Sequence, residues 1–155
     1  MRLKILWPGK TKNRDFRSLQ EFYLGRIGQL AACEIVETRE AKGLEEKFSQ
    51  KISELEARGL EKHLEDDYII CLSDQGQEMN SGDFARFMEK AAMKSGRPLT
   101  FIVGGFSGLA ERILKHADAR LSLSKMTFSH ELSRVILLEQ IYRSLSILKG
   151  THYAK

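Results

Sequence analysis

The sequence predicts an α/β fold, a parallel-sheet α/β sandwich with helices on both faces of the sheet. Two runs, Tyr68 to Leu72 and Leu99 to Val103, are continuously apolar without alternation, which is typical of parallel strands covered on both faces. Runs of this kind alternate along the chain with segments whose apolar residues recur at helical spacing. With 155 residues, of which 42% are hydrophobic and 30% charged, the chain is expected to form a single domain over 1–155.

The first third of the chain has a β-α-β pattern followed by a charged helix. A short apolar run from Leu3 to Trp7 is closed by Pro8 and Gly9, and a second run spans Ala31 to Val36. Between them, apolar residues at helical spacing predict the first helix. The segment 44–64 predicts a largely exposed helix with a narrow apolar stripe, and Gly59 can interrupt this helix. The stripe consists of Leu44, Phe48, Ile52 and Leu55.

The rest of the chain alternates helices with strands. Ser81 can cap a helix that ends near Gly96, and a shorter helix is expected from about Leu109 to Ala117. A short strand over 120–124 then leads to a final helix over 130–149. The apolar residues of this last helix cover more than one stripe. We therefore expect it to pack both on the sheet and on a partner subunit.

Composition excludes several classes of protein. No window approaches the roughly 18 apolar residues of a membrane span, and the first residues lack the apolar core of a signal peptide. The expected location is therefore the cytoplasm, with no membrane partner. Cys33 and Cys71 lie in apolar runs without a Cys-x-x-Cys or Cys/His spacing, so we expect buried, reduced thiols and no metal site.

Charge is unevenly distributed along the chain. Residues 1–30 carry seven Lys or Arg against two Asp or Glu, and residues 112–155 carry eight against three, whereas residues 34–67 carry six against eleven. Two basic ends allow a basic face for a polyanion. Ordinary solvated helices explain the same distribution.

A glycine-rich turn, Ile102-Val-Gly-Gly-Phe-Ser-Gly108, leaves a central apolar strand and enters a helix. Glycines there let backbone amides approach a ligand at the carboxyl end of the strands, where open α/β sheets bind small molecules. No Gly-Lys-Ser/Thr follows, so the turn is not a P-loop, and Lys125 stands where a dinucleotide fingerprint expects an acid. A plain tight turn is the alternative.

A second unusual stretch, Leu121 to His130, joins short apolar and hydroxyl residues to the final helix without glycine or proline. Such a loop can supply backbone hydrogen bonds and apolar walls to an aromatic ligand such as adenine. A buried connection that packs its own side chains is the alternative interpretation.

Several polar residues interrupt the apolar final helix. Glu139 and Arg143 have the spacing of a helical ion pair, and Arg134 is either an interface ion-pair partner or a phosphate contact. His130 is a candidate base near neutral pH, or else a cap or packing residue.

Taken together, the strings LSLSKMTFSHELSRVILLEQIYRSLSILKGTHY, FIVGGFSGL, YIICLSDQG and KILWPGK resemble the pseudouridine N3-methyltransferases of the SPOUT class, which act on large-subunit ribosomal RNA. The resemblance extends over nearly the whole chain. It implies a C-terminal trefoil knot that binds S-adenosylmethionine, and a homodimer in which the tail of one subunit completes the site of the other. The cofactor residues that it implies are Leu72, Gly104, Gly105, Gly108, Leu123, Ser124, Lys125, Met126, Thr127 and Phe128.

The resemblance also implies a reaction, the methylation of nitrogen 3 of a pseudouridine in large-subunit ribosomal RNA, which is expected to take place on the assembled ribosome. Alignment of the methyl group with the base nitrogen is the main task, and that nitrogen must lose a proton. Arg143 or Lys155 can stabilise the developing anion, and His130 or Tyr153 can assist the proton transfer.

The chain departs from the family pattern at three places. Ser129 replaces a usual proline, a change that a serine N-cap can absorb. Phe106 stands where smaller residues or proline are common, and Ala154 follows Tyr153 where the family has histidine. Two alternatives therefore remain open: a SPOUT methyltransferase acting on another RNA, and a catalytically weak ribosome-binding factor.

Overall fold

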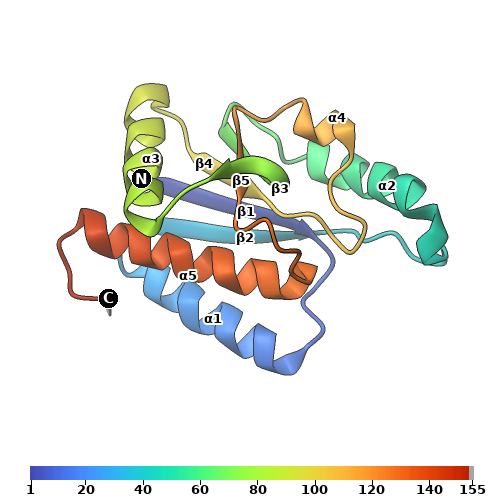
Figure 1. Ribbon diagram of the computed structural model, residues 1–155, viewed down its shortest axis with the longest axis horizontal. Coiled ribbons are helices and arrows are strands. Elements are labelled where there is room, and N and C mark those ends of the chain that lie inside the picture. Colours follow the sequence, from blue (N-terminus) through green and yellow to red (C-terminus); the bar gives the residue numbers. More distant parts are fainter. Residues whose placement is uncertain (154–155) are drawn as a thin grey trace.

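A computed structural model describes residues 1–153 and contains a five-stranded sheet, shown in Figure 1. The strands are β1 (Arg2–Pro8), β2 (Ala32–Thr38), β3 (Tyr68–Glu78), β4 (Leu99–Ile102) and β5 (Ala119–Ser122). They lie in the order β2-β1-β4-β3-β5, and every pair is parallel. The predicted parallel α/β sheet is confirmed.

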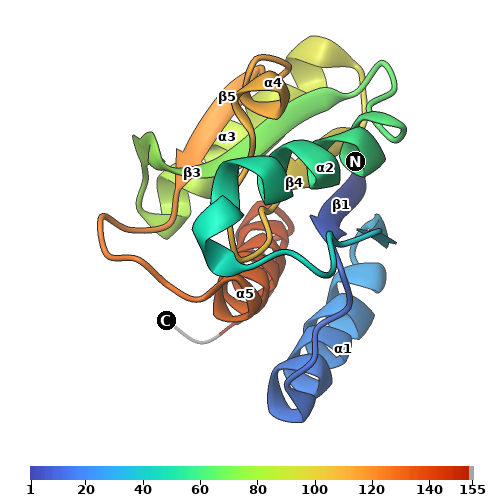
Figure 2. The same cartoon turned by 90° about the vertical axis from the view of Figure 1, so that its right-hand side faces the viewer.

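Helices cover both faces of this sheet, as Figures 1 and 2 show. On one face lie α1 (Arg14–Gly28), α3 (Ser81–Ser95) and α5 (His130–Leu148). On the other lie α2 (Ser49–Glu61), which follows a 3-10 turn at Glu46–Phe48, and the short α4 (Glu111–Leu114). Alternate strand residues supply the two cores, so that Ile5 and Trp7 face α1 and α5 whereas Leu6 faces α2. The result is a three-layer sandwich.

Polar caps set where the long helices begin. The side chain of Asn13 accepts hydrogen bonds from the first turn of α1. Asn80, and not the expected Ser81, caps α3, and the Ser81 hydroxyl instead donates to Gln140 of α5. Ser129 caps α5 by accepting from the Leu132 N–H, which confirms that serine replaces the usual proline without loss of the helix start.

The prediction of the apolar stripe on the helix over 44–64 is wrong, because another face of α2 is buried. Phe48 and Leu55 are 45% and 39% exposed, whereas Ser53, Glu56, Ala57 and Leu60 are buried. The helix is rotated so that Ser53, Ala57 and Leu60 pack toward the sheet and Glu56 is buried beside the glycine turn. A Cβ on Gly59 would lie only 3.5 Å from the Cβ of Thr38, and the helix continues through this glycine to Glu61.

The final helix buries more of its apolar surface within its own chain than expected. Leu137, Leu138, Ile141 and Leu145 are buried between the sheet and the flanking helices α1 and α3. Ile147 is its exposed large apolar residue, at 48%. Much of the surface assigned from sequence to a partner subunit is therefore already covered.

Both cysteines are free thiols, Cys71 buried and Cys33 half-buried. Burial raises the pKa of each thiol to about 12, so both stay protonated at neutral pH. Within residues 1–153, no helix combines the length and the apolar character needed to cross a membrane. The trefoil knot implied by the resemblance stays a prediction.

Candidate functional site

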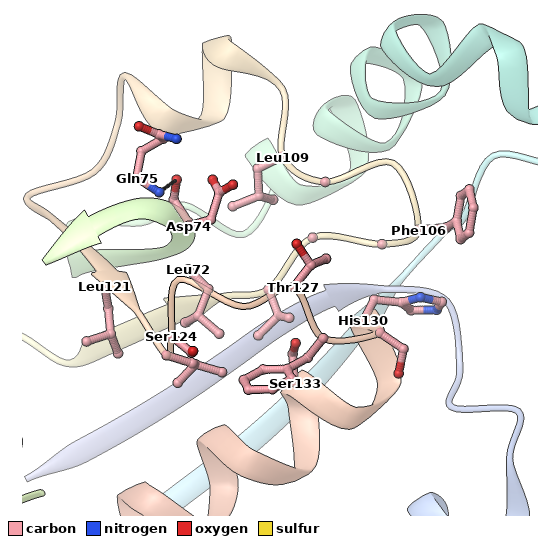
Figure 3. A pocket seen from close by; sticks show the side chains of 18 of the residues that line it. Leu72, Asp74, Gln75, Phe106, Leu109, Leu121, Ser124, Thr127, His130 and Ser133 are labelled. Atoms are coloured by element: carbon pink, nitrogen blue, oxygen red, sulfur yellow. Dashed lines mark hydrogen bonds between the residues drawn. The ribbon is translucent and has the colours of Figure 1, made fainter. Parts of the chain in front are cut away.

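A cavity of about 870 Å³ opens at the carboxyl ends of the strands, where Figure 3 shows four segments meeting. These are the bend inside β3, the glycine turn after β4, the loop after β5 and the first turn of α5. The lining residues are Leu72, Ser73, Asp74, Gln75, Val103, Gly104, Gly105, Phe106, Gly108, Leu109, Leu114, Leu121, Leu123, Ser124, Met126, Thr127, Phe128, Ser129, His130 and Ser133. Open α/β sheets bind ligands at this edge.

The glycine turn is closed by its own backbone and also lines the cavity. The Gly108 N–H donates to the Gly105 carbonyl at 3.0 Å, and Gly108 has a φ of 75°. A Cβ on Gly104 would lie 2.6 Å from the carbonyl carbon of Gly108. These glycines therefore form a tight turn and also one wall of the cavity, since glycine is needed at positions 104 and 108 to form that wall.

Behind this turn lies a buried carboxyl group. A Cβ on Gly105 would stand 3.0 and 3.1 Å from the two carboxyl oxygens of Glu56, which is 5% exposed. Burial, with a further contribution from Glu40, raises the pKa of Glu56 to about 7, although Arg134 opposes the shift. The absence of a side chain on Gly105 leaves the space that the Glu56 carboxyl group fills.

The loop after β5 is held by its own hydroxyl groups. The Ser122 hydroxyl donates to the Ser124 carbonyl at 3.0 Å, and the Ser124 hydroxyl accepts from the Met126 N–H at 3.0 Å. Leu123, Ser124, Met126, Thr127 and Phe128, which the resemblance implies as cofactor residues, line the cavity. The side chain of Lys125 is exposed and is not part of the lining.

The resemblance implied Leu72 as a cofactor residue, but the sequence analysis did not identify the three residues after it as part of the cavity. The pairing of β3 with β5 shifts between Leu72 and Gln77, so residues 73–76 leave the ladder, and Ser73, Asp74 and Gln75 line the cavity. Gly76 permits this bend, because a Cβ there would lie 2.6 Å from the Leu121 backbone. The signal was present in the sequence as a polar Ser-Asp-Gln-Gly directly after a buried strand.

His130 is the first residue of α5 and lines the cavity, while Ser129 acts as the cap. Burial, helped by the charge of Arg134, lowers the pKa of His130, although Glu131 opposes the shift. The imidazole is therefore neutral at pH 7 and can accept a proton. Its ring lies edge-on to Phe106, with 6.5 Å between centroids.

Neither sequence interpretation of Arg134 is correct. The residue is 1% exposed, and its guanidinium donates to the carbonyls of Pro8 and Gly9 and to the Thr11 hydroxyl. It also lies 4.8 Å over the Trp7 ring. Arg134 thus anchors the segment after β1, a role that depends on tertiary contacts more than 120 residues apart in the sequence.

The other proposed catalytic residues lie at the far end of α5. Arg143 pairs with Glu139 at 2.6 Å, as the spacing predicted, and stands about 20 Å along the helix from His130 at roughly 1.5 Å per residue. Tyr153 packs on Tyr142 and on Arg143. Burial and a contact with Tyr23 raise the pKa of Tyr153 to about 12. Lys155 lies outside the described residues.

The cavity and the chain end are therefore separated within one subunit. Figure 1 shows that the last described residues leave α5 at the end opposite to its start. Arg143 and Tyr153 cannot complete the cavity of their own chain in this arrangement. Among residues 1–153, no group of three or more His, Cys, Asp or Glu side chains could hold a metal ion.

Comparisons with known proteins place this architecture in a family. Proteins named "Ribosomal RNA large subunit methyltransferase H" from Geobacter metallireducens and Clostridium kluyveri are 38% and 35% identical. The first match covers 99% of this chain and 98% of the relative, and the second covers all of both.

A solved structure gives the same fold. "The structure of a probable methylase family protein from Haemophilus influenzae Rd KW20" has a TM-score of 0.57 at 10% identity, covering 99% of this chain and 70% of that one. The family model described as "Predicted SPOUT methyltransferase" matches residues 1–154. The chain belongs to the SPOUT methyltransferase family.

Proposed function

We propose that this chain is an S-adenosylmethionine-dependent methyltransferase that methylates nitrogen 3 of a pseudouridine in large-subunit ribosomal RNA. The observation that carries the proposal is the cavity itself, which a SPOUT chain forms from its glycine turn and its 123–129 loop. The full-length similarity to large-subunit ribosomal RNA methyltransferases supports the choice of substrate.

The lining suits both the adenosine part and the charged methionine part of S-adenosylmethionine. Leu72, Leu121 and Phe128 offer apolar walls for a purine, while Ser124 and Thr127 offer hydroxyl groups for polar edges. Asp74 is the carboxylate of the lining and can balance a positive sulfonium or ammonium group. When bound, the cofactor supplies a methyl group already activated by its sulfonium, so that the transfer needs no metal.

The residues of the chain have the task of alignment and proton removal. His130 lines the cavity beside Phe106 of the glycine turn, and its neutral imidazole can accept the proton that the base nitrogen loses. Tyr153 keeps its own proton at neutral pH, and therefore acts as a hydrogen-bond donor and not as a base. Arg143 supplies positive charge for the anion that forms on the base.

A homodimer brings these residues together. Arg143 and Tyr153 lie too far from their own cavity, so they contribute only to the cavity of a second copy. The surface of α1 and α5 next to them carries Leu19, Phe22 and Ile147, each more than 40% exposed, and this face suits a contact between copies. We further propose one methyltransferase domain over 1–155, acting in the cytoplasm where ribosomes are found.

Methyl transfer from labelled S-adenosylmethionine tests the function. Ribosomes, free ribosomal RNA and small subunits, all from a strain that lacks the modification, serve as parallel substrates. We expect label in large-subunit RNA of assembled ribosomes, and mass spectrometry should place it on a pseudouridine. Label in another RNA would replace the substrate, and absence of label with normal ribosome binding would identify a binding factor.

A further inference from the structure

The segment between β1 and α1 carries three basic side chains on an unusually well-fixed loop. Lys10, Lys12 and Arg14 are exposed to solvent. Beneath them, Arg134 donates to the carbonyls of Pro8 and Gly9, and the Thr11 hydroxyl donates to Gln20 at 2.7 Å. A loop whose backbone is ordered in advance loses little entropy when its side chains bind a partner.

Glu131 fixes this loop beside the cavity. The carboxylate of Glu131, in the first turn of α5, accepts the N–H groups of Lys12 and Asn13. Glu131 directly follows His130, which lines the cavity. Figure 1 accordingly shows the chain between β1 and α1 passing the end of α5 at which the 123–129 loop arrives. The basic side chains therefore stand at the rim of the proposed methyl-transfer site.

An exposed aromatic side chain lies on the other side of His130. Phe106, at the tip of the glycine turn, is 67% exposed and meets the His130 ring edge-on. Figure 3 shows its ring directed away from the cavity interior. An exposed phenylalanine on a turn contributes nothing to the core, which leaves its face available for stacking.

The cavity lacks cations of its own. Among residues 1–153, the lining contains no lysine or arginine, and its carboxylate Asp74 repels phosphate. Binding of a polyanionic substrate must therefore draw on charge outside the cavity. Lys10 and Arg14 form no ion pair with any described residue, and Lys12 has only a surface pair with Glu40 at 3.4 Å, which a phosphate can replace.

We propose that Lys10, Lys12, Arg14 and Phe106 form the RNA-docking rim of the cavity. The three cations contact phosphates next to the target nucleotide, and Phe106 stacks on an unpaired neighbouring base. This inference rests on the proposed function, because it assigns the surface through which that substrate is held. Cations for phosphates and aromatic faces for splayed bases are the combination that single-stranded RNA sites use.

Removing the three charges tests the phosphate contacts. We compare Lys10→Gln/Lys12→Gln/Arg14→Gln with a control that loses equal charge elsewhere, Lys51→Gln/Lys90→Gln/Lys94→Gln on α2 and α3. Binding to ribosomes is measured without cofactor over a range of salt concentrations. For the rim variant we expect the salt slope of log K to fall by about two units, at roughly 0.7 per contact, while the control stays near wild type.

Kinetics separate docking from chemistry. In methyl transfer, the rim variant should show a KM raised at least about tenfold with kcat within roughly twofold, and calorimetry should give unchanged cofactor affinity. Phe106→Ala should weaken ribosome binding about tenfold without changing the salt slope, and Phe106→Trp should restore binding where Phe106→Leu does not.

Three results would overturn the assignment: equal loss in the control triple variant, an unchanged salt slope in the rim variant, or full recovery by Phe106→Leu. Light scattering adds a fourth, since a rim variant that becomes monomeric while binding ribosomes normally would assign this surface to the contact between copies. The binding arm needs no turnover. A protein that binds ribosomes through the rim but labels no RNA would contradict the proposed reaction and leave the docking surface supported.

Discussion

Glu56 shows how a single buried residue couples the candidate site to stability. Its carboxyl group is buried behind Gly105 with a pKa of about 7, against 4.5 for an ordinary glutamate. Between pH 4.5 and 7, the Glu56 carboxyl group is ionised in the unfolded chain but keeps its proton in the folded chain. Stability from this group is therefore complete below about pH 4.5 and falls as the pH rises toward 7, by about 1.4 kcal/mol per pH unit.

Replacing Glu56 with glutamine should remove this dependence. We expect the free energy of unfolding of Glu56→Gln to increase relative to that of wild type as the pH rises from about 4.5 to 7. This increase should persist above pH 7. Urea unfolding followed at several pH values measures the difference. The exposed Glu21→Gln on α1 is the control, and a pH-independent difference for Glu56→Gln would show that its carboxyl group ionises normally.

Gly104 gives a second test at this scale. A Cβ at position 104 would overlap the Gly108 backbone, so Gly104→Ala should displace the turn and weaken S-adenosylmethionine binding at least about tenfold. Gly25→Ala on α1 is the matched control, because its Cβ meets nothing within 4 Å. Calorimetry should give wild-type affinity for the control, and wild-type affinity in folded Gly104→Ala would remove the turn from the cofactor site.

Single residues also mark what the sequence could not predict. The glycine turn and the loop from Leu123 to Phe128 could be singled out from the sequence because each is a short continuous string, and their cofactor role was implied by the resemblance. Arg134 was not understood, since its acceptors at Pro8, Gly9 and Thr11 are brought to it only by the folded sheet. Asp74 was passed over, although a polar Ser-Asp-Gln-Gly follows the buried run, because only the fold reveals the shift in strand pairing that brings residues 73–75 to the cavity.

At the scale of elements, the strands were predicted better than the helix faces. Continuous apolar runs identify buried parallel strands by composition alone, and β1, β3 and β4 lie where these runs are. For α2, the large apolar residues Phe48 and Leu55 pointed to the wrong face, because the buried face is formed around Ala57 and Leu60. The segment expected as a helix over 109–117 is α4, only Glu111–Leu114.

Two identical substitutions on α2 test the observed face. Leu60 is 1% exposed, so Leu60→Ala should lower the free energy of unfolding by about 2 to 5 kcal/mol. Leu55 is largely outside the core, so Leu55→Ala should cost less than about 1 kcal/mol. Chemical denaturation measures both. A larger loss for Leu55→Ala would restore the stripe expected from the sequence.

At the scale of the whole molecule, the cavity and the residues meant to complete it occupy opposite ends of α5. His130 begins the helix, whereas Arg143 and Tyr153 lie near its far end and pack against each other. No movement of the tail alone carries Arg143 to its own cavity, because α5 is packed along its length against the sheet, α1 and α3. The composite site between two copies that we propose would reconcile these positions.

Mixing two inactive variants tests this arrangement directly. One variant, Gly104→Val, has a blocked cavity and an intact tail, and the other lacks residues 151–155 but keeps its cavity. Each alone should be nearly inactive if the tail acts across the dimer. After unfolding and refolding together in equal amounts, half of the dimers pair one copy of each, and each mixed dimer has one cavity with a working tail. Activity should therefore reach about one quarter of wild type. If each tail served its own cavity, every site in the mixture would remain defective, and no activity would return at any mixing ratio.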